Sequence, residues 1–366
     1  MRLTANEVRF NRLQEFKSPR LRSERSCTMN VLFLGGTGTI STACVADAIS
    51  QGLNVYILNR GKTLKRPIAQ EVKIIIGDAY NDNDLLSAIS NNKIDVVADF
   101  LCFDDVRAQH IFKLLAGKIA QYIFIGTASA YQKPIHRLPI TEMTPLDPRG
   151  LSGYSQKKID AENVFVSAYE REKFPVTIVR PSHTYDDANP PLIGDWTNWK
   201  RVLNGHPIFL WGDGTTLWTL THADDFALGF TGILGNGKTI GDDFHITSDE
   251  SPTWNEIYYQ IGLATGVTPN IFNLTSKQIK VAIPDWFWAN QIIGDLSHSA
   301  VFDNSKVKAI SPRFKPSITW ADGAKRLAKW YDANSSKIIF DEEIDVKCDR
   351  LYKIHKGINE FITKLT

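Results

Sequence analysis

A glycine-rich turn at residues 35–38, with the sequence Gly-Gly-Thr-Gly, joins an apolar run at residues 31–34 to a helix-length segment at residues 39–51. The apolar run is the first of six that alternate with helix-length segments as far as residue 179. Short continuous apolar runs are typical of strands buried on both faces of a parallel sheet. Their alternation with helices indicates right-handed βαβ units. The sequence therefore predicts an α/β fold with a doubly wound parallel sheet.

The predicted elements follow one another at short intervals. The expected strands are residues 31–34, 55–58, 72–76, 96–100, 122–125 and 176–179, and the expected helices are residues 39–51, 82–90, 105–116 and 154–172. Beyond residue 181 the alternation gives way to loops rich in Pro, Gly, Asp and Trp. A further strand is expected near residues 243–246 and a final amphipathic helix near residues 321–331.

The glycines of the turn suit the approach of a phosphate group. Glycine tolerates a tight turn and places no Cβ in the way of a ligand, while the next helix directs free N–H groups and its positive dipole end to the same point. A glycine-rich loop between a buried strand and a helix is the pattern of a Rossmann dinucleotide site, and a tight turn without a ligand is the alternative. The predicted cofactor contacts from this loop are Gly35, Thr37, Gly38, Thr39 and Ile40.

Polar residues follow the second and third predicted strands, where the adenosine half of a dinucleotide would lie. Asn59, Arg60 and Lys62 stand where an NAD site usually offers an acid to the ribose 2′-hydroxyl, and basic residues accommodate a 2′-phosphate instead. NADP(H) is therefore the favoured cofactor. NAD(H) is the alternative, in which Arg60 and Lys62 are solvated loop charges. Asp78 is a candidate acceptor for the adenine amino group or, equally, a turn residue.

Tyr154 and Lys158 are four residues apart at the start of a predicted helix, so they share one face of it. A tyrosine with a pKa of about 10 is a poor base at neutral pH, but a nearby lysine cation and an oxidised nicotinamide both favour the phenolate. Thr127, just past the fifth predicted strand, supplies a hydroxyl for the reacting oxygen, with Ser129 as the alternative. We predict Thr127, Tyr154 and Lys158 as catalytic residues and Ser129 as a substrate contact.

Six motifs in order resemble the extended short-chain dehydrogenase/reductases, specifically the NAD-dependent epimerase/dehydratase family. The resemblance spans about residues 30–333 and implies a Rossmann domain with a smaller C-terminal α/β substrate-binding region. It implies the same Thr/Tyr/Lys trio, cofactor contacts from Phe100, Pro181 and Ser182, and a homodimer through two helices per subunit. The motifs are the glycine-rich loop, the strand-end hydroxyls at 126–131, Tyr-x-x-x-Lys at 154–158, Val-Arg-Pro-Ser at 179–182, Gly-Asp-Gly at 212–214 and His-Ala-Asp-Asp at 222–225.

The sequence also departs from that family. Its sugar-nucleotide dehydratases carry Asp-Glu where this chain has Ala128-Ser129, so dehydration is disfavoured. Trp218 replaces an arginine that holds the substrate diphosphate in its sugar-nucleotide epimerases, so that bidentate donor is missing. His183, Trp218 and His222 are predicted substrate contacts, with structural hydrogen bonding as the alternative for both histidines. A further alternative is that the tryptophans of this region line an apolar pocket instead of packing a core: Trp196, Trp199, Trp211 and Trp218.

The composition limits the classes of partner. The net charge of the 366 residues is +2, and residues 1–28 carry seven basic against three acidic residues, so the rest of the chain is close to neutral. Nucleic acid is a disfavoured partner, because a nucleic-acid-binding face clusters lysine and arginine. The four cysteines show no metal-ligand spacing, and no apolar stretch is long enough to span a membrane. We expect a cytoplasmic protein without a metal site.

The expected organisation is a disordered leader at residues 1–28, an NAD(P)-binding Rossmann domain at 29–181, a substrate-binding region at 182–336 and a C-terminal extension at 337–366. Some segments of the substrate-binding region are expected to return to the Rossmann core. The expected function is an NAD(P)-dependent epimerase or oxidoreductase acting on a hydroxyl or carbonyl of a sugar-like or small alcohol substrate. The Gly-Asp-Gly turn followed by His222 and Asp, together with Asn59-Arg60-Gly61, resembles a divergent branch of the family that includes the chloroplast stem-loop-binding proteins. This resemblance implies the alternative, a non-catalytic cofactor-binding or RNA-binding regulatory protein of the same fold.

Overall fold

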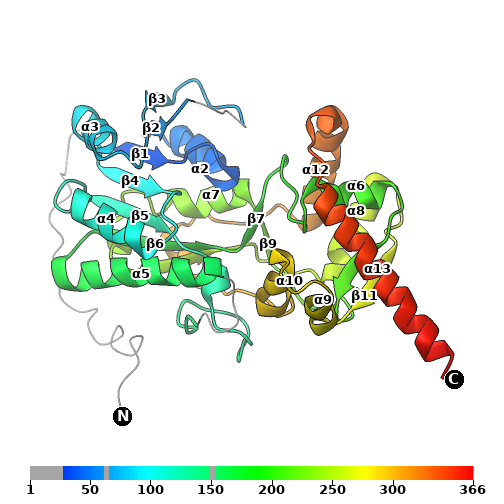
Figure 1. Ribbon diagram of the computed structural model, residues 1–366. Helices are drawn as coiled ribbons and strands as arrows, with labels where there is room; N and C mark the ends of the chain where they lie inside the picture. The colour runs from blue at the N-terminus through cyan, green and yellow to red at the C-terminus, as the bar shows by residue number, and fades with distance from the viewer. Residues whose placement is uncertain (1–27, 62–65, 148–152, 366) are drawn as a thin grey trace, which may run out of the picture.

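The computed structural model describes residues 28–61, 66–147 and 153–365, which form a larger and a smaller lobe (Figure 1). Of the expected leader, only residue 28 lies within the described residues. The larger lobe contains a seven-stranded sheet in the order β10-β6-β5-β4-β1-β2-β3, with all neighbours parallel. The predicted doubly wound α/β fold is thus confirmed. The strands are β1 (Asn30–Leu34), β2 (Asn54–Asn59), β3 (Lys73–Ile76), β4 (Val96–Asp99), β5 (Gln121–Ile125), β6 (Val176–Pro181) and β10 (Asp243–Ile246).

Both faces of this sheet are apolar because successive side chains of a strand point to opposite sides. In β1, Val31 and Phe33 join the core under α2 and α7, whereas Leu32 and Leu34 join the core on the side of α3, α4 and α5. The chain returns to the larger lobe after it has formed the first segments of the smaller one, because side chains of α7 and β10 belong to the core of the larger lobe. The helices are α2 (Thr39–Ser50), α3 (Asp82–Asn92), α4 (Asp105–Leu115), α5 (Gly153–Glu172) and α7 (Ala223–Thr231).

The strand β3 differs from its prediction. Ile74 and Ile76 are 46% and 69% exposed, whereas the sequence predicts a strand buried on both faces. The reason is topological, since β3 is the outer strand of the described sheet and pairs with β2 alone. A continuous apolar run does not reveal whether its strand lies at the centre or at the edge.

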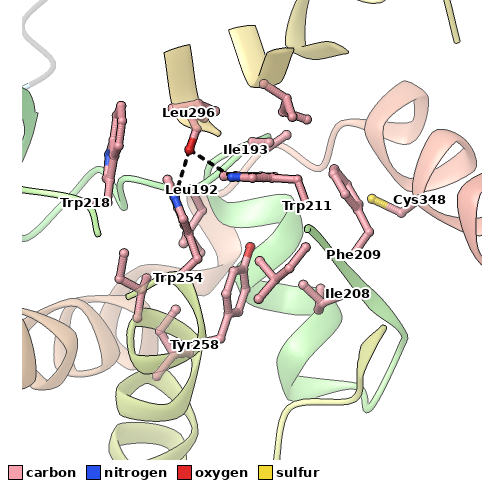
Figure 2. Close-up of a cluster of buried hydrophobic side chains, with 14 of the residues drawn as sticks. Leu192, Ile193, Ile208, Phe209, Trp211, Trp218, Trp254, Tyr258, Leu296 and Cys348 are labelled. Atoms are coloured by element: carbon pink, nitrogen blue, oxygen red, sulfur yellow. Dashed lines mark hydrogen bonds between the residues drawn. The ribbon is translucent and has the colours of Figure 1, made fainter. Parts of the chain in front are cut away.

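The smaller lobe packs around tryptophans (Figure 2). Trp196, Trp199, Trp211 and Trp218 are all at least 92% buried, and the carbonyl of Leu296 accepts hydrogen bonds from the indoles of Trp211 and Trp254. These tryptophans are packing residues, so the hypothesis that they line an apolar substrate pocket is wrong. The elements around them include β8 (Ile208–Trp211), β11 (Ile271–Leu274), α6 (Trp196–Leu203), α8 (Trp254–Thr265), α9 (Ser276–Ala282), α10 (Phe287–Gln291) and α12 (Trp320–Asn334).

A small parallel pair of strands, β7 (His183–Tyr185) and β9 (Leu220–His222), lies between the two lobes (Figure 1). β7 leaves the end of β6 after a single residue, Ser182, and β9 leads directly into α7. Segments predicted to contact the nicotinamide and the substrate are therefore continuous with the sheet of the larger lobe.

The C-terminal helix α13 (Glu342–Thr363) extends across the smaller lobe (Figure 1). Ile344, Cys348 and Leu351 pack into the lobe's core. The buried guanidinium of Arg201, from α6, forms ion pairs with Asp345 and Asp349 of α13. Although α13 has 22 residues, neither it nor any other described helix is long and apolar enough to cross a membrane.

We predict that Arg201→Ala lowers the free energy of unfolding by about 2 kcal/mol, because hydrogen bonds to charged groups contribute roughly 1.5–3 kcal/mol. Denaturant unfolding would measure the loss, and hydrogen exchange should rise first in α13. Lys325→Ala is the control, since Lys325 and Asp322 form an exposed i,i+3 pair and its loss should cost less than about 0.5 kcal/mol. Equal losses in the two variants would contradict the anchoring role of Arg201.

Candidate functional site

The turn at residues 35–38 packs closely against Leu101, which follows β4, and Ile57 of β2. Gly35 has φ +81°, and a Cβ there would lie 2.8 Å from Leu101 Cδ2; a Cβ on Gly36 would lie 2.8 Å from Ile57 Cγ1. Ser41 closes the turn by accepting from the Gly38 N–H at 2.8 Å and donating to the Gly35 carbonyl at 2.6 Å. The result is a tight cradle in which three of the four residues are glycines.

Helix α2 begins at the rim of this cradle, at Thr39. The first N–H groups of a helix have no intrahelical acceptor, and they carry the positive end of the helix dipole. Thr37, Thr39 and Ile40 are half-buried beside Gly38. The cradle and the helix end together fit a diphosphate group.

The predicted adenosine residues lie together at the ends of β2 and β3. The Oδ1 atom of Asn59 accepts from the Gly61 N–H at 2.9 Å, and its Nδ2 atom is buried without a partner among the described residues. Asp78 accepts from the Tyr80 N–H at 3.0 Å, which makes it a turn residue whatever else it contacts. Arg60 is exposed, and Lys62 lies outside the described residues. A buried donor without an acceptor among the described residues is open to a ligand or a water molecule.

Lys158 is buried at the ends of β4 and β5. Its Nζ atom donates to the carbonyls of Cys102 and Ile125, both at 2.7 Å, and lies 4.4 Å from the ring centre of Phe103. Desolvation lowers the pKa of Lys158 to about 8. The ammonium has three donors, so one remains after the two carbonyls.

Tyr154 lies one helical turn before Lys158, with 44% of its side chain exposed. Desolvation raises the pKa of the Tyr154 phenol above its ordinary value. The effect of Lys158 on the phenolate stays a prediction. The phenol is the dominant form at neutral pH.

Three hydroxyls form a hydrogen-bonded chain beside these two residues. Thr127 Oγ1 lies 3.0 Å from Ser129 Oγ, which lies 2.8 Å from Ser155 Oγ. Thr127 and Ser129, the two predicted alternatives, thus act as neighbours in one chain. Ser155 was not predicted, because nothing in the sequence except its position after Tyr154 connects it to residues 127–129. If Ser155 and Ser129 each donate toward Thr127, the Thr127 proton is left for a ligand oxygen.

The residues predicted beside the nicotinamide and the substrate lie where β6, β7 and β9 meet. Ser182 Oγ, next to Pro181, is 2.7 Å from Thr221 Oγ1. Trp218 donates from Nε1 to His183 Nδ1 at 2.9 Å, and burial lowers the pKa of His183 to about 4. His183 is therefore neutral at pH 7, with its proton on Nε2.

His222 and Phe100 have partners within the protein. His222 Nδ1 accepts from the Asp224 N–H at 3.1 Å at the start of α7, and its Nε2 lies 2.9 Å from Asp187 Oδ1. Both ring nitrogens are occupied, which supports the structural alternative for this histidine. The ring of Phe100 stacks on Phe33, and it belongs to the core under α2 and α7.

A buried ionic network beneath the site was not predicted. Arg180 forms ion pairs with Glu162 of α5 and Asp243 of β10, and its Nη1 donates to Tyr131 Oη at 3.1 Å. Tyr131 Oη in turn lies 3.1 Å from His245 Nδ1. The network connects the helix that carries Tyr154 and Lys158 to the strand that ends at Pro181. Among the described residues, no three His, Cys, Asp or Glu side chains are grouped as metal ligands.

Comparison with known sequences places these features in a family. The model of the NAD dependent epimerase/dehydratase family matches residues 31–247, from β1 through β10. A chloroplast stem-loop binding protein of 41 kDa from Arabidopsis thaliana is 25% identical over 288 residues, which cover 74% of this chain and 73% of that protein. A dTDP-D-glucose 4,6-dehydratase from Bos taurus is 21% identical over 343 residues, covering 84% and 90% of the two chains.

Solved structures show the same fold. A dTDP-glucose 4,6-dehydratase from Bacillus anthracis in complex with NAD has a TM-score of 0.67 at 20% identity, covering 84% of this chain and 98% of that one. A UDP-glucuronic acid 4-epimerase from Bacillus cereus in complex with NAD has a TM-score of 0.64 at 17% identity, covering 85% and 99%. With the family match over more than half of its length, the chain belongs to the NAD dependent epimerase/dehydratase family of extended short-chain dehydrogenase/reductases.

Proposed function

We propose that the protein is an NAD(P)-dependent epimerase or oxidoreductase that acts on a hydroxyl or carbonyl of a sugar-like or small alcohol substrate. The observation that carries this proposal is the grouping of Lys158, the Thr127 hydroxyl chain and Tyr154 at the end of β5, next to the glycine cradle. Residues 101–102 join the two parts, because Leu101 packs against Gly35 and the Cys102 carbonyl binds Lys158.

The cofactor, when bound, supplies a nicotinamide that accepts a hydride from the substrate carbon or returns it. Thr127 donates a hydrogen bond to the substrate oxygen. The Tyr154 phenolate, which the Lys158 cation and an oxidised nicotinamide would favour, accepts the hydroxyl proton as the C–O bond becomes a carbonyl. In the reverse direction Tyr154 returns that proton from the phenol, the form that its raised pKa keeps dominant at neutral pH. The remaining donor of Lys158 would be available to a ribose hydroxyl of the bound cofactor or to Tyr154 Oη. An epimerase would return the hydride to the opposite face of the same carbon, and an oxidoreductase would release the product.

The substrate side supports these two reactions over dehydration. Ala128 is buried, and Ser129 is engaged with Thr127 and Ser155, so neither residue supplies the acid and base of a dehydratase. Trp218 is buried against Trp254, and it offers no bidentate donor to a diphosphate. The substrates named in the relatives, dTDP-glucose and UDP-glucuronic acid, therefore belong in a screen alongside free sugars and small alcohols.

A second candidate is a non-catalytic or RNA-binding role, favoured by the stem-loop binding relative. The near-neutral charge of the chain after residue 28 argues against it. A gel-shift series with a structured RNA tests it, because true phosphate contacts lose affinity steeply as salt is added.

We predict that Tyr154→Phe lowers kcat by at least about 100-fold, because general acid–base groups contribute roughly 10²–10⁴ to the rate. Its affinity for NADPH should stay unchanged in a fluorescence titration. Tyr259→Phe, which alters an exposed tyrosine of α8, is the matched control and should retain wild-type turnover. Full activity of Tyr154→Phe on a substrate found in the screen would exclude the assigned chemistry.

We predict that Gly35→Ala weakens NAD(P)H binding at least about tenfold, because backbone strain at positive φ costs roughly 1–3 kcal/mol and the new methyl group meets Leu101. Gly52→Ala is the matched control, since Gly52 has φ +77° but nothing within 4 Å of a Cβ. Both variants share the strain, and only the first should change the dissociation constant. Similar constants for the two variants would count against the cradle as the cofactor site.

For cofactor choice we propose NADP(H), supported by the unpartnered Asn59 Nδ2 atom, a donor that suits a phosphate oxygen. Asn59→Asp should raise the dissociation constant of NADPH about tenfold without weakening NADH, because a carboxylate repels the 2′-phosphate and accepts from a 2′-hydroxyl. Asn81→Asp, at the N-cap of α3, makes the same charge change and should alter neither constant. Equal weakening of both cofactors by Asn59→Asp would refute this choice.

A further inference from the structure

Arg66 reaches from the segment after β2 to the beginning of α2. Its Nη2 atom donates to Thr39 Oγ1 at 3.1 Å, and its Nε atom forms an ion pair with Asp186. The side chains of Arg66 and Asp186 are only 14% and 15% exposed. Thr39 is the first residue of α2, and Asp186 directly follows β7. The guanidinium thus lies between the cradle of the larger lobe and the strands that join the lobes.

This place is unusual for a cation with an ordinary structural role. A guanidinium beside a helix N-terminus meets the positive end of the helix dipole, which disfavours it. Asp186 offsets that cost, so the pair is tolerable without a ligand. A dinucleotide diphosphate at the beginning of α2 would be attracted both by the positive end of the helix dipole and by the Arg66 guanidinium, so the repulsion between these two would be offset.

The geometry leaves donors for such an anion. A guanidinium has five N–H donors, and the contacts to Thr39 and Asp186 use Nη2 and Nε. Arg66 Nη1 has no acceptor among the described residues. Asp186 accepts at Nε, so it fixes the plane of the guanidinium while Nη1 stays available.

We propose that Arg66 binds the diphosphate of the dinucleotide cofactor and that Asp186 is its positioning residue. This inference rests on the proposed cofactor site and adds to it a contact from outside the glycine-rich loop. Because Asp186 follows the segment of Ser182 and His183, the pair also connects the proposed diphosphate site to the segment that carries predicted nicotinamide and substrate contacts.

The test measures dissociation constants of NADH and NADPH by fluorescence titration with the full chain. Arg66→Met should weaken both cofactors by the same factor, at least about tenfold, because a charge-assisted hydrogen bond to the group they share is lost. Weakening of NADPH alone would assign Arg66 to the 2′-phosphate and overturn the proposal. Unchanged affinity for both would also overturn it. Arg313→Met is the matched control, since it removes an ion pair with Asp47 near the other end of α2 and should change neither constant.

A double variant separates the direct contact from the effect of an unpaired carboxylate. Arg66→Met with Asp186→Asn removes both charges and keeps the local net charge of the wild type. Its affinity for NADH should remain as weak as that of Arg66→Met. Recovery of wild-type affinity would show that Asp186 repulsion caused the loss, and it would overturn the proposal. If the wild-type protein bound neither NADH nor NADPH, the proposed function would fail as well, whereas failure of the Arg66 variants alone leaves that function intact.

Discussion

Arg180 lies wholly buried between α5 and the end of the sheet, and the geometry of the site depends on how its charge is neutralised. Glu162 and Asp243 supply two carboxylates, and both are buried. The carboxylates keep the guanidinium charged and raise its pKa above the ordinary value despite desolvation. A buried charge left without its partner is strongly destabilising, so α5, β6 and β10 are confined to positions that keep all three groups in contact. This constraint also fixes the positions of the site residues on these elements, which are Tyr154 and Lys158 on α5 and Pro181 at the end of β6.

The proposed cofactor half and the proposed substrate half of the site are built differently. The cofactor half consists of the glycine-rich turn, the beginning of α2, the Asn59 amide, which has no partner among the described residues, and the cation of Arg66. The substrate half is lined by groups that already bind one another, such as His183 with Trp218 and Ser182 with Thr221. Polar groups that already bind one another have fewer donors and acceptors left for a ligand. The described contacts therefore support the proposed cofactor more directly than they support a particular substrate.

Much of the larger lobe could be predicted from the sequence, since its signals are local. The helix expected at residues 82–90 is α3 (Asp82–Asn92), and the strand expected near residues 243–246 is β10 (Asp243–Ile246). The prediction that β3 is buried on both faces was wrong, because an apolar run does not show whether its strand has neighbours on one side or on both. The roles of Thr127, Tyr154 and Lys158, the preference for NADP(H), the homodimer and the cytoplasmic location stay predictions. Ser155 could not be predicted, because its contact with Ser129 is made across 26 positions of the chain.

By itself the sequence determined the βαβ alternation, the phosphate-type turn and the spacing of Tyr154 and Lys158. These depend on periodicity and on the backbone freedom of glycine, which act over a few residues. Only the tertiary structure decided that four tryptophans pack a core, that His222 caps α7 and that Arg66 meets Asp186 across 120 positions. Such contacts join residues that are distant in the chain, so they depend on how the elements pack together. The tertiary fold decides which partner a buried cation contacts, whereas the pattern of a segment's own residues indicates whether it forms a strand.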